Sequence, residues 1–304
     1  MHATARIPTS TSLAAVTFCV VDIETTGGSG ADSITEIAAL KVCCGEEVGA
    51  FETLVSCVGD IPPSIVQLTG ITTAMVRDAP FVEEVLPHLL EFAHGCVLVG
   101  HNVRFDLRFL NGELQRSGYR PFEVPVLDTL ALSRRLITDE AENCRLGTLA
   151  ERLGLEHRPT HRAMTDVRAT VDLLHALIER SSGYGVRALD DLLALPRTAG
   201  HAQARKLAWI GRMPRTPGVV LAHGPGEEVI HLEATSNLRR RARTWFAVRD
   251  GRRIGPMLRE AQRFSWVETE DRAAAEAHEA QLLDRHRPRY RRPPGRRARY
   301  RRPG

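Results

Sequence analysis

The hydrophobic pattern of the chain begins with a short apolar run, Val16 to Val21, which is typical of a buried strand. Two acidic residues, Asp22 and Glu24, follow it at alternate positions. Because alternate residues of a strand point to the same face, we expect these two carboxylates to lie side by side. Such a pair repels itself unless a cation lies between the two groups, and Mg²⁺ or Mn²⁺ is the natural occupant. Taken alone, a strand end with solvated acids is the commoner explanation of this triplet.

The pattern then continues as strands separated by short turns and later as helices alternating with strands. Apolar segments at 34–42 and 48–55 predict an antiparallel meander with the first strand. Further strands are expected at 97–99 and 125–128, and helices at 81–93, 103–117, 129–136, 146–153 and 163–180. A meander followed by β-α-β-α predicts a layered α/β domain with a mixed five-stranded sheet and flanking helices.

A second, smaller pattern occupies the C-terminal third. Segments 218–222 and 228–232 predict a hairpin, 264–268 a strand, and 272–285 a helix. Between them, residues 236–246 form a very basic helical pattern with Ser236 as the expected N-cap. We therefore expect a flexible N-terminus (1–13), an α/β domain (14–182), a linker (183–216), a small α/β domain (217–285) and a basic disordered tail (286–304).

The formal net charge of +4 is unevenly distributed. The last twenty residues hold ten arginines and no acid, so the remainder of the chain is net acidic. This distribution indicates a polyanion-binding tail rather than a basic domain. The six cysteines form no CxxC pair, and we interpret them as reduced core residues of a cytoplasmic protein. The first apolar run is interrupted by acids, which argues against a signal peptide or a membrane span.

Two further acids and a histidine fall where a metal site needs them. Asp106 is expected in the first turn of one helix and Asp166 in the first turn of another, with His161 in the loop before it. Four carboxylates around one point would hold two divalent ions about 3.5–4 Å apart, an arrangement that serves phosphoryl transfer. A histidine suits the role of general base toward the attacking water. Individually, these residues could equally be a surface histidine and ordinary helix acids.

Three segments resemble motifs I to III of the DnaQ-like DEDDh 3′–5′ exonucleases, which include proofreading subunits of polymerases. They are Val21-Asp-Ile-Glu-Thr-Thr-Gly27, His101-Asn-Val-Arg-Phe-Asp106 and His161-Arg-Ala-Met-Thr-Asp166. The resemblance covers about 14–182 and implies a ribonuclease H-like fold. It implies that Asp22, Glu24, Asp106 and Asp166 bind two Mg²⁺ or Mn²⁺ ions and that His161 is the general base. The substrate-binding residues it implies are Thr25, Thr26, Gly27, His101, Asn102 and Phe105. Asp128 resembles a supporting acidic position, or it simply caps the following helix.

The smaller pattern resembles the GIY-YIG module of the bacterial excision-repair endonuclease. The matching segments are Pro217 to Val220, Asn237 to Phe246 and Glu279 to Tyr290. By this resemblance Arg241 and Glu279 match the catalytic arginine and the metal-binding glutamate. Val220 stands where the family has its first tyrosine, and His231-Leu-Glu-Ala234 stands where it has Tyr-x-Gly-Lys. We therefore expect a vestigial module, in which His231 is the candidate substitute base.

Basic and aromatic residues of this module and of the tail are candidates for nucleic-acid binding. Arg239, Arg240, Arg241 and Arg243 can neutralise phosphates, and Trp245, Tyr290 and Tyr300 can stack on bases. The alternative is a solvated basic face with Trp245 in a small core. The tail is expected to bind a polyanion.

The sequence thus predicts a metal-dependent 3′–5′ exonuclease that releases nucleoside 5′-monophosphates from DNA, in repair or proofreading. Its expected partners are a DNA 3′ end and a polymerase or repair complex, with a nucleoid-associated location and no membrane. Two alternatives stay open: a nucleic-acid-binding scaffold with dispensable catalysis, and an RNA-trimming exoribonuclease. The preference for DNA depends on analogy with the fused repair-like module.

Overall fold

The computed structural model describes residues 7–137, 140–247 and 254–290. Most of the predicted basic tail, including Tyr300, lies outside the described residues. The chain divides into two compact units. The first comprises residues 1–181 and 187–196, and the second comprises residues 182–186 and 197–304. Each unit is described separately below.

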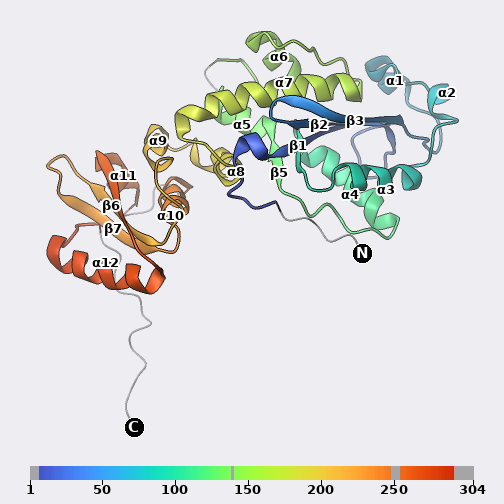
Figure 1. Ribbon diagram of the computed structural model, residues 1–304. Helices are drawn as coiled ribbons and strands as arrows, with labels where there is room; N and C mark the ends of the chain where they lie inside the picture. The colour runs from blue at the N-terminus through green and yellow to red at the C-terminus, as the bar shows by residue number, and fades with distance from the viewer. Residues whose placement is uncertain (1–6, 138–139, 248–253, 291–304) are drawn as a thin grey trace. The chain divides into compact units, whose positions relative to one another are not determined.

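The first unit is built on a five-stranded mixed sheet with the strand order β3-β2-β1-β4-β5 (Figure 1). Strands β1 to β3 pair antiparallel, whereas β4 and β5 run parallel to β1, which confirms the predicted meander followed by β-α-β. The strand bounds are β1 (Thr17–Thr25), β2 (Ile34–Cys43), β3 (Glu46–Leu54), β4 (Val97–Gly100) and β5 (Val126–Asp128). The central strand β1 extends four residues beyond its apolar run, because its acidic end still pairs with β2.

Helices cover both faces of this sheet (Figure 1). The helices of this unit are α1 (Pro63–Thr69), α2 (Thr73–Val76), α3 (Val82–Phe92), α4 (Arg104–Arg116), α5 (Thr129–Leu136), α6 (Leu146–Leu153), α7 (Ala163–Ser181) and α8 (Leu189–Thr198), whose last residues belong to the second unit. A 3₁₀ turn, η1 (Leu13–Ala15), precedes β1. Gly154 ends α6 in the left-handed conformation with φ of 63°.

The alternation of side chains along β1 assigns a different task to each face. Cys19, Val21 and Ile23 belong to the apolar core that β1 shares with helices α3 and α4. The intervening residues, Asp22 and Glu24 among them, therefore lie on the opposite face, toward α7, which packs on β1 and β2. The strand thus anchors itself on one face and presents its acids on the other.

The last segment of the first unit returns to its beginning. The backbone N–H groups of Leu189 and Asp190 donate to the carbonyls of Thr11 and Thr9, at 3.0 and 2.8 Å. Ser12 and Ala188 also form an isolated antiparallel bridge. Residues 187–190 are therefore part of the first unit, although the five residues before them belong to the second.

The second unit contains a three-stranded antiparallel sheet with the order β7-β6-β8. Its strands are β6 (Gly218–His223), β7 (Val229–Thr235) and β8 (Arg263–Glu268), and its helices are α9 (Leu207–Ile210), α10 (Leu238–Thr244), α11 (Ile254–Glu260) and α12 (Arg272–His286). Three 3₁₀ turns complete it: η2 (Ser182–Tyr184), η3 (Ala204–Lys206) and η4 (Trp245–Ala247). Helix α12 packs on one face of the sheet through a small apolar cluster that includes Val219, Leu221 and Ala275.

One expectation for the second unit is corrected, and one of its helices was not expected. Helix α10 is capped by Asn237 rather than Ser236, because the Asn237 side chain accepts a hydrogen bond from the N–H of Arg240 at 2.9 Å. Helix α11 was not predicted. Its carboxyl end is held by Lys206, whose Nζ donates to the carbonyls of Leu258 and Ala261 at 2.6 and 2.8 Å.

The cysteines are free but are not uniformly core residues. Only Cys19 and Cys96 are buried, whereas Cys43, Cys57 and Cys144 are half-buried and Cys44 is exposed. The expectation of six core cysteines is therefore wrong for four of them, because their apolar segments end at or near them. Among the helices of the described residues, none has both the length and the apolar character that crossing a lipid bilayer requires.

Candidate active site

Asp22 and Glu24 are carried by the end of β1, the strand at the centre of the sheet. Burial, and then the charges of Asp106, Asp166 and Glu24, raise the pKa of Asp22 well above its usual value. Burial, followed by the charge of Asp166, raises the pKa of Glu24 to about 7. The charges of carboxylates from distant parts of the chain thus add to the effect of burial on both acids.

Asp106 lies in the first turn of α4 and is 4% exposed. Its Oδ1 accepts a hydrogen bond from the backbone N–H of Ile23, between the two acids of β1, at 3.2 Å. Strand β4 stops pairing with β1 at Val20, so the N–H of Ile23 is left for this side chain. Burial raises the pKa of Asp106 to about 7, despite the hydrogen bonds that it accepts.

Asp166 and His161 bring the third sequence segment to the same place. The ligating atoms of Glu24, His161 and Asp166 all lie within 4.8 Å of one another. Asp166 accepts a hydrogen bond from the N–H of Thr160 at 2.9 Å, which folds the loop back onto the first turn of α7. His161 is exposed and has a φ of 58°, in the left-handed region that non-glycine residues rarely adopt.

A fifth acid, Glu36, was missed by the sequence analysis. It lies on β2 directly opposite Glu24 and is 1% exposed. Both of its oxygens are bound by Arg162 and one also accepts from the N–H of Ala163. The available signal was a charged residue inside the apolar run 34–40, since a buried charge requires a partner.

The donor set fits hard divalent cations. It consists of four carboxylates, Asp22, Glu24, Asp106 and Asp166, with one imidazole beside them, and oxygen ligands are those that Mg²⁺ and Mn²⁺ prefer. The pKa of each of these four carboxyl groups is raised by burial. A cation among them would remove the repulsion that the protein alone leaves uncompensated.

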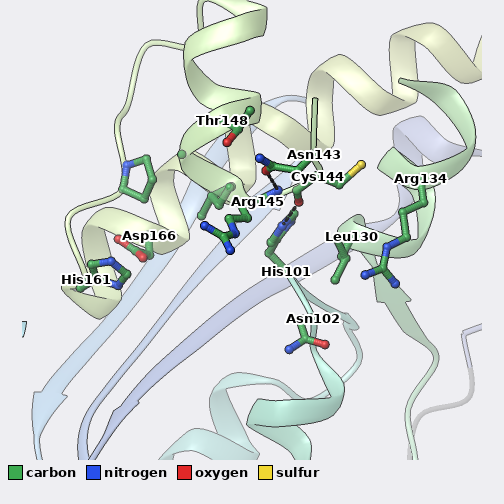
Figure 2. A pocket seen from close by; sticks show the side chains of 13 residues that line it. His101, Asn102, Leu130, Arg134, Asn143, Cys144, Arg145, Thr148, His161 and Asp166 are labelled. Carbon is green, nitrogen blue, oxygen red and sulfur yellow. Dashed lines mark hydrogen bonds between the residues drawn. The ribbon is translucent and has the colours of Figure 1, made fainter. Parts of the chain in front are cut away.

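A cavity of about 940 Å³ extends from this cluster (Figure 2). His161 and Asp166 line one end of it, and His101 lies near its middle. Two arginines that sequence reasoning did not single out, Arg134 and Arg145, also line the cavity. Its volume is that of a small-molecule site, and its positive charges suit a phosphate-bearing ligand.

His101 is fixed by both ring nitrogens. Nδ1 lies 3.0 Å from the hydroxyl of Thr129, and Nε2 lies 2.9 Å from the carbonyl oxygen of Cys144. Burial lowers the pKa of His101, so we assign the neutral ring, with Nε2–H donating to the carbonyl of Cys144. The hydroxyl of Thr129, which lies beside Nδ1, donates to the carbonyl of Gly100 at 3.1 Å. His101 therefore shapes the cavity wall, whereas the exposed His161 has no hydrogen bond to its ring among the described residues.

The other expected substrate-binding residues surround the end of β1 and the start of α4. Thr25 donates its hydroxyl to the carbonyl of Gly27 at 2.6 Å, and the hydroxyl of Thr26 accepts from the N–H of Ser33 at 2.9 Å. Asn102 is exposed on the cavity wall with a φ of 71°. Phe105 packs against Phe109, with ring centroids 5.1 Å apart.

Asp128 caps a helix and also supports the site. Its Oδ1 accepts from the N–H of Leu130, at the start of α5, and from the N–H of Asn102, both at 3.0 Å. The capping role that the sequence analysis left open is therefore present. The second bond ties the turn that carries Asn102 to the end of β5.

In the second unit, each of the three vestigial candidates is held by a different partner. Nδ1 of His231 lies 2.7 Å from the carbonyl oxygen of Tyr290, and Glu279 accepts from the N–H of Ala234 at 3.2 Å. Arg241 forms a two-pronged ion pair with Glu233, the residue at the position of the family's glycine. Burial opposes ionisation of Glu233, yet the nearby ring of His231, whose Nε2 lies 3.9 Å from Oε2, and the hydrogen bonds from Arg241 lower the pKa of Glu233 to about 2.

The expected nucleic-acid-binding role of the basic helix is corrected for two residues. Arg243 is 4% exposed and Trp245 is 2% exposed, so neither can reach a nucleic acid. Trp245 belongs to the small core, where its ring packs edge-on against His231 at 5.2 Å. Arg239 donates to the carbonyl of Met213 at 2.7 Å, and Arg240 is exposed.

Comparison with known proteins agrees with this division. Residues 19–174 match the exonuclease family model RNase_T, and residues 216–291 match the model of the UvrC-like GIY-YIG domain. A Mycobacterium tuberculosis protein, provisionally named a bifunctional exonuclease/endonuclease, is 43% identical over 290 residues, which are 92% of this chain and 45% of that protein. The PolC-type DNA polymerase III of Caldanaerobacter subterraneus is 43% identical over 176 residues, which are 58% of this chain and 12% of the polymerase.

The fold comparison gives the same picture. The structure of Escherichia coli exonuclease I in complex with a dT13 oligonucleotide aligns with a TM-score of 0.52 at 22% identity. The alignment covers 68% of this chain and 48% of that one. At this identity the likeness establishes the fold. The chain spans less than half the length of these curated relatives.

Proposed function

We propose a function for this chain from the premise that it belongs to the RNase T/DnaQ-like 3′–5′ exonuclease family and carries a UvrC-like GIY-YIG domain. The proposed activity is metal-dependent hydrolysis of the 3′-terminal phosphodiester of DNA, which releases nucleoside 5′-monophosphates. The observation that carries it is the convergence of three distant segments on one acidic cluster, at the end of a cavity lined by arginines.

In this proposal Asp22, Glu24, Asp106 and Asp166 would hold the divalent cations. Bound there, the cations would supply Lewis-acid stabilisation of charge on the scissile phosphate. The functional limits remain those proposed from the sequence, with 14–182 as the nuclease and 217–285 as the appended module.

The chain's own residues supply the remaining chemistry. His161 is exposed beside the acids and accepts the proton of the attacking water as that water adds to phosphorus. The bond to the 3′-oxygen of the preceding nucleotide then breaks, that oxygen takes up a proton from solvent, and His161 returns its own proton to solvent. Asn102 and His101 line the wall against which the terminal nucleotide would lie. Arg134 and Arg145 suit the binding of its phosphate or of a neighbouring one.

A direct test is digestion of DNA and RNA oligonucleotides of identical sequence, labelled at either end, with Mg²⁺, Mn²⁺ or EDTA. Progressive shortening of 5′-labelled DNA, with mononucleotides released from 3′-labelled DNA, is the expected result. Faster digestion of the RNA would favour the exoribonuclease alternative. Tight, salt-sensitive DNA binding in EDTA without turnover would favour the scaffold.

Participation in proofreading or repair, with a polymerase or repair complex as partner, is part of the proposal.

We further propose that the second unit binds or positions nucleic acid but does not cut it. The charge of Arg241 is already matched by Glu233, which is 7% exposed and lies across the sheet from Val220. The name of the Mycobacterium tuberculosis relative includes endonuclease, so the proposal requires a test. Nicking of supercoiled plasmid by the full chain with Asp22→Ala, which removes the exonuclease, is expected to stay at background in Mg²⁺ and Mn²⁺. Metal-dependent nicking would overturn it.

A further inference from the structure

We propose that Glu36 and Arg162 form a clamp that positions His161 for the hydrolysis, an inference that rests on the proposed exonuclease function. Glu36 is a carboxylate on the middle strand of the meander, where it is 1% exposed and lies opposite Glu24. A charge in such a place costs several kcal/mol unless it is paired and hydrogen-bonded. The structure supplies that pairing from the two residues that directly follow His161.

The contacts of the clamp are bidentate and directional. Nε of Arg162 donates to the two oxygens of Glu36 at 3.2 and 3.1 Å, and its Nη2 donates to Oε1 at 2.6 Å. The backbone N–H of Ala163, the first residue of α7, donates to Oε2 at 2.8 Å. Side chain and main chain of consecutive residues are thus fixed to one carboxylate, which determines how the chain enters α7.

His161 needs such support because of its backbone. A non-glycine residue in the left-handed region costs about 1–2 kcal/mol, and His161 has a φ of 58°. On its N-terminal side, the N–H of Thr160 is bound by Asp166. On its C-terminal side, the clamp holds Arg162 and Ala163. The imidazole therefore projects from one residue between two anchored neighbours, within 4.8 Å of Glu24 and Asp166.

The same contacts distinguish Glu36 from the proposed metal ligands. Both of its oxygens are taken by Arg162 and Ala163, so it is not presented to a cation. Arg162 also lowers the pKa of Glu24 against the larger effects of burial and of Asp166 and Glu36. Glu36 and Arg162 are positioning residues, and they act through the place that they give to His161.

Loosening the clamp should reduce turnover more than binding. A displacement of a catalytic group by about 1 Å costs on the order of 10²-fold in rate. We expect Arg162→Ala and Glu36→Gln to lower kcat by about that factor and to leave KM within about twofold. Arg162→Lys keeps the positive charge but cannot form the bidentate contact, and its kcat should fall less than that of Arg162→Ala. The control is Arg168→Ala, which removes the ion pair of Arg168 with Glu47, another pair between α7 and the sheet, and should change little.

The experiment measures steady-state and single-turnover digestion of a 5′-labelled oligonucleotide by the full chain in Mn²⁺. Each clamp variant is also combined with His161→Ala. If the clamp acts through His161, adding Arg162→Ala to His161→Ala lowers kcat little further. A merely structural role predicts that Arg162→Ala lowers kcat by the same factor in the wild type and in His161→Ala.

Hydrogen exchange in EDTA supplies a readout that is independent of activity. Amides of 160–163 should exchange faster in Arg162→Ala, and the core of β1 should stay protected. An active wild type with unchanged kcat in Arg162→Ala, or equal losses in both backgrounds, would overturn the clamp alone. A wild type without exonuclease activity would overturn the proposed function, and the role of the clamp with it.

Discussion

Glu24 and Glu36 lie directly opposite each other on the antiparallel strands β1 and β2, yet only Glu36 is hydrogen-bonded to Arg162. Like charges in this position normally destabilise a sheet. Glu36 is neutralised by Arg162, whereas the pKa of Glu24 is raised to about 7 by burial and by the charge of Asp166. Glu36 is thereby paired within the fold, whereas a cation beside Glu24 would stabilise its ionised form.

This difference predicts how the stability of the metal-free protein depends on pH. The pKa values of Glu24 and Asp106 are raised to about 7 from ordinary values of 4.5 and 3.8. Between those limits the folded state binds more protons than the unfolded state, so stability is present at low pH and falls as pH rises toward 7. Thermal unfolding in EDTA should show Tm decreasing from pH 5 to pH 8. Added Mg²⁺ or Mn²⁺ should restore Tm at pH 8, and a metal-independent Tm there would contradict the cation site.

Asp106→Asn should separate stability from activity. The amide oxygen can still accept the N–H of Ile23, but the negative charge is lost. We expect a higher Tm than wild type in EDTA at pH 8, because repulsion within the cluster is relieved. Exonuclease activity should fall by at least about 10³-fold, since several kcal/mol of charge stabilisation is removed. Glu47→Gln, at an exposed acid of β3, is the control, and comparable loss in it would argue against a specific effect.

His101→Ala tests the assignment of the two histidines. The ring of His101 joins the turn before α4 to the carbonyl of Cys144, across the cavity wall. Its loss leaves partly buried polar groups unpaired, which costs about 1–3 kcal/mol. We expect a lower Tm and a raised KM with DNA, whereas His161→Ala should lower kcat by about 10²–10⁴-fold at nearly wild-type Tm. A large loss of kcat in His101→Ala with little effect in His161→Ala would instead make His101 the general base.

Trp245→Ala and Arg240→Ala should separate folding from DNA binding in the second unit. Trp245 is buried against His231 and Phe264, so truncation should destabilise this unit by about 3–5 kcal/mol. Arg240 is exposed, so its removal should leave Tm unchanged and should reduce the salt dependence of DNA binding by about one phosphate contact. Fluorescence anisotropy at several salt concentrations measures the second effect. If the salt dependence of DNA binding is unchanged in Arg240→Ala, this face of α10 does not contact DNA.

The sequence predicted the sheet well because its strands are apolar runs with clear breaks, as between 16–21 and 34–42. It did not predict the pairing of Glu36 with Arg162, because 126 residues separate them and no local pattern links them. Helix α11 was missed because its seven residues contain both Gly255 and Pro256, which normally interrupt helices.

The burial of Trp245 was nevertheless visible in the sequence. Leu238, Ala242, Trp245 and Phe246 recur at helical spacing within the arginine-rich segment and form its inward face. Of the basic residues, Arg243 falls between two of these apolar positions and is drawn inward with them.

The path of the chain between its two units limits how the protein can be dissected. Residues 182–186 belong to the second unit, and residues 187–196 return to the first, where they pair with the segment near residue 12. A Cβ on Gly211 would lie 2.5 Å from the carbonyl oxygen of Gly185. The loop 182–186 therefore packs closely against the end of α9. No single proteolytic or genetic cut therefore yields both halves complete. A nuclease fragment that ends at 196 includes residues 182–186 without the unit on which they pack. A C-terminal fragment that begins at 197 lacks the loop at Gly185 that packs against Gly211.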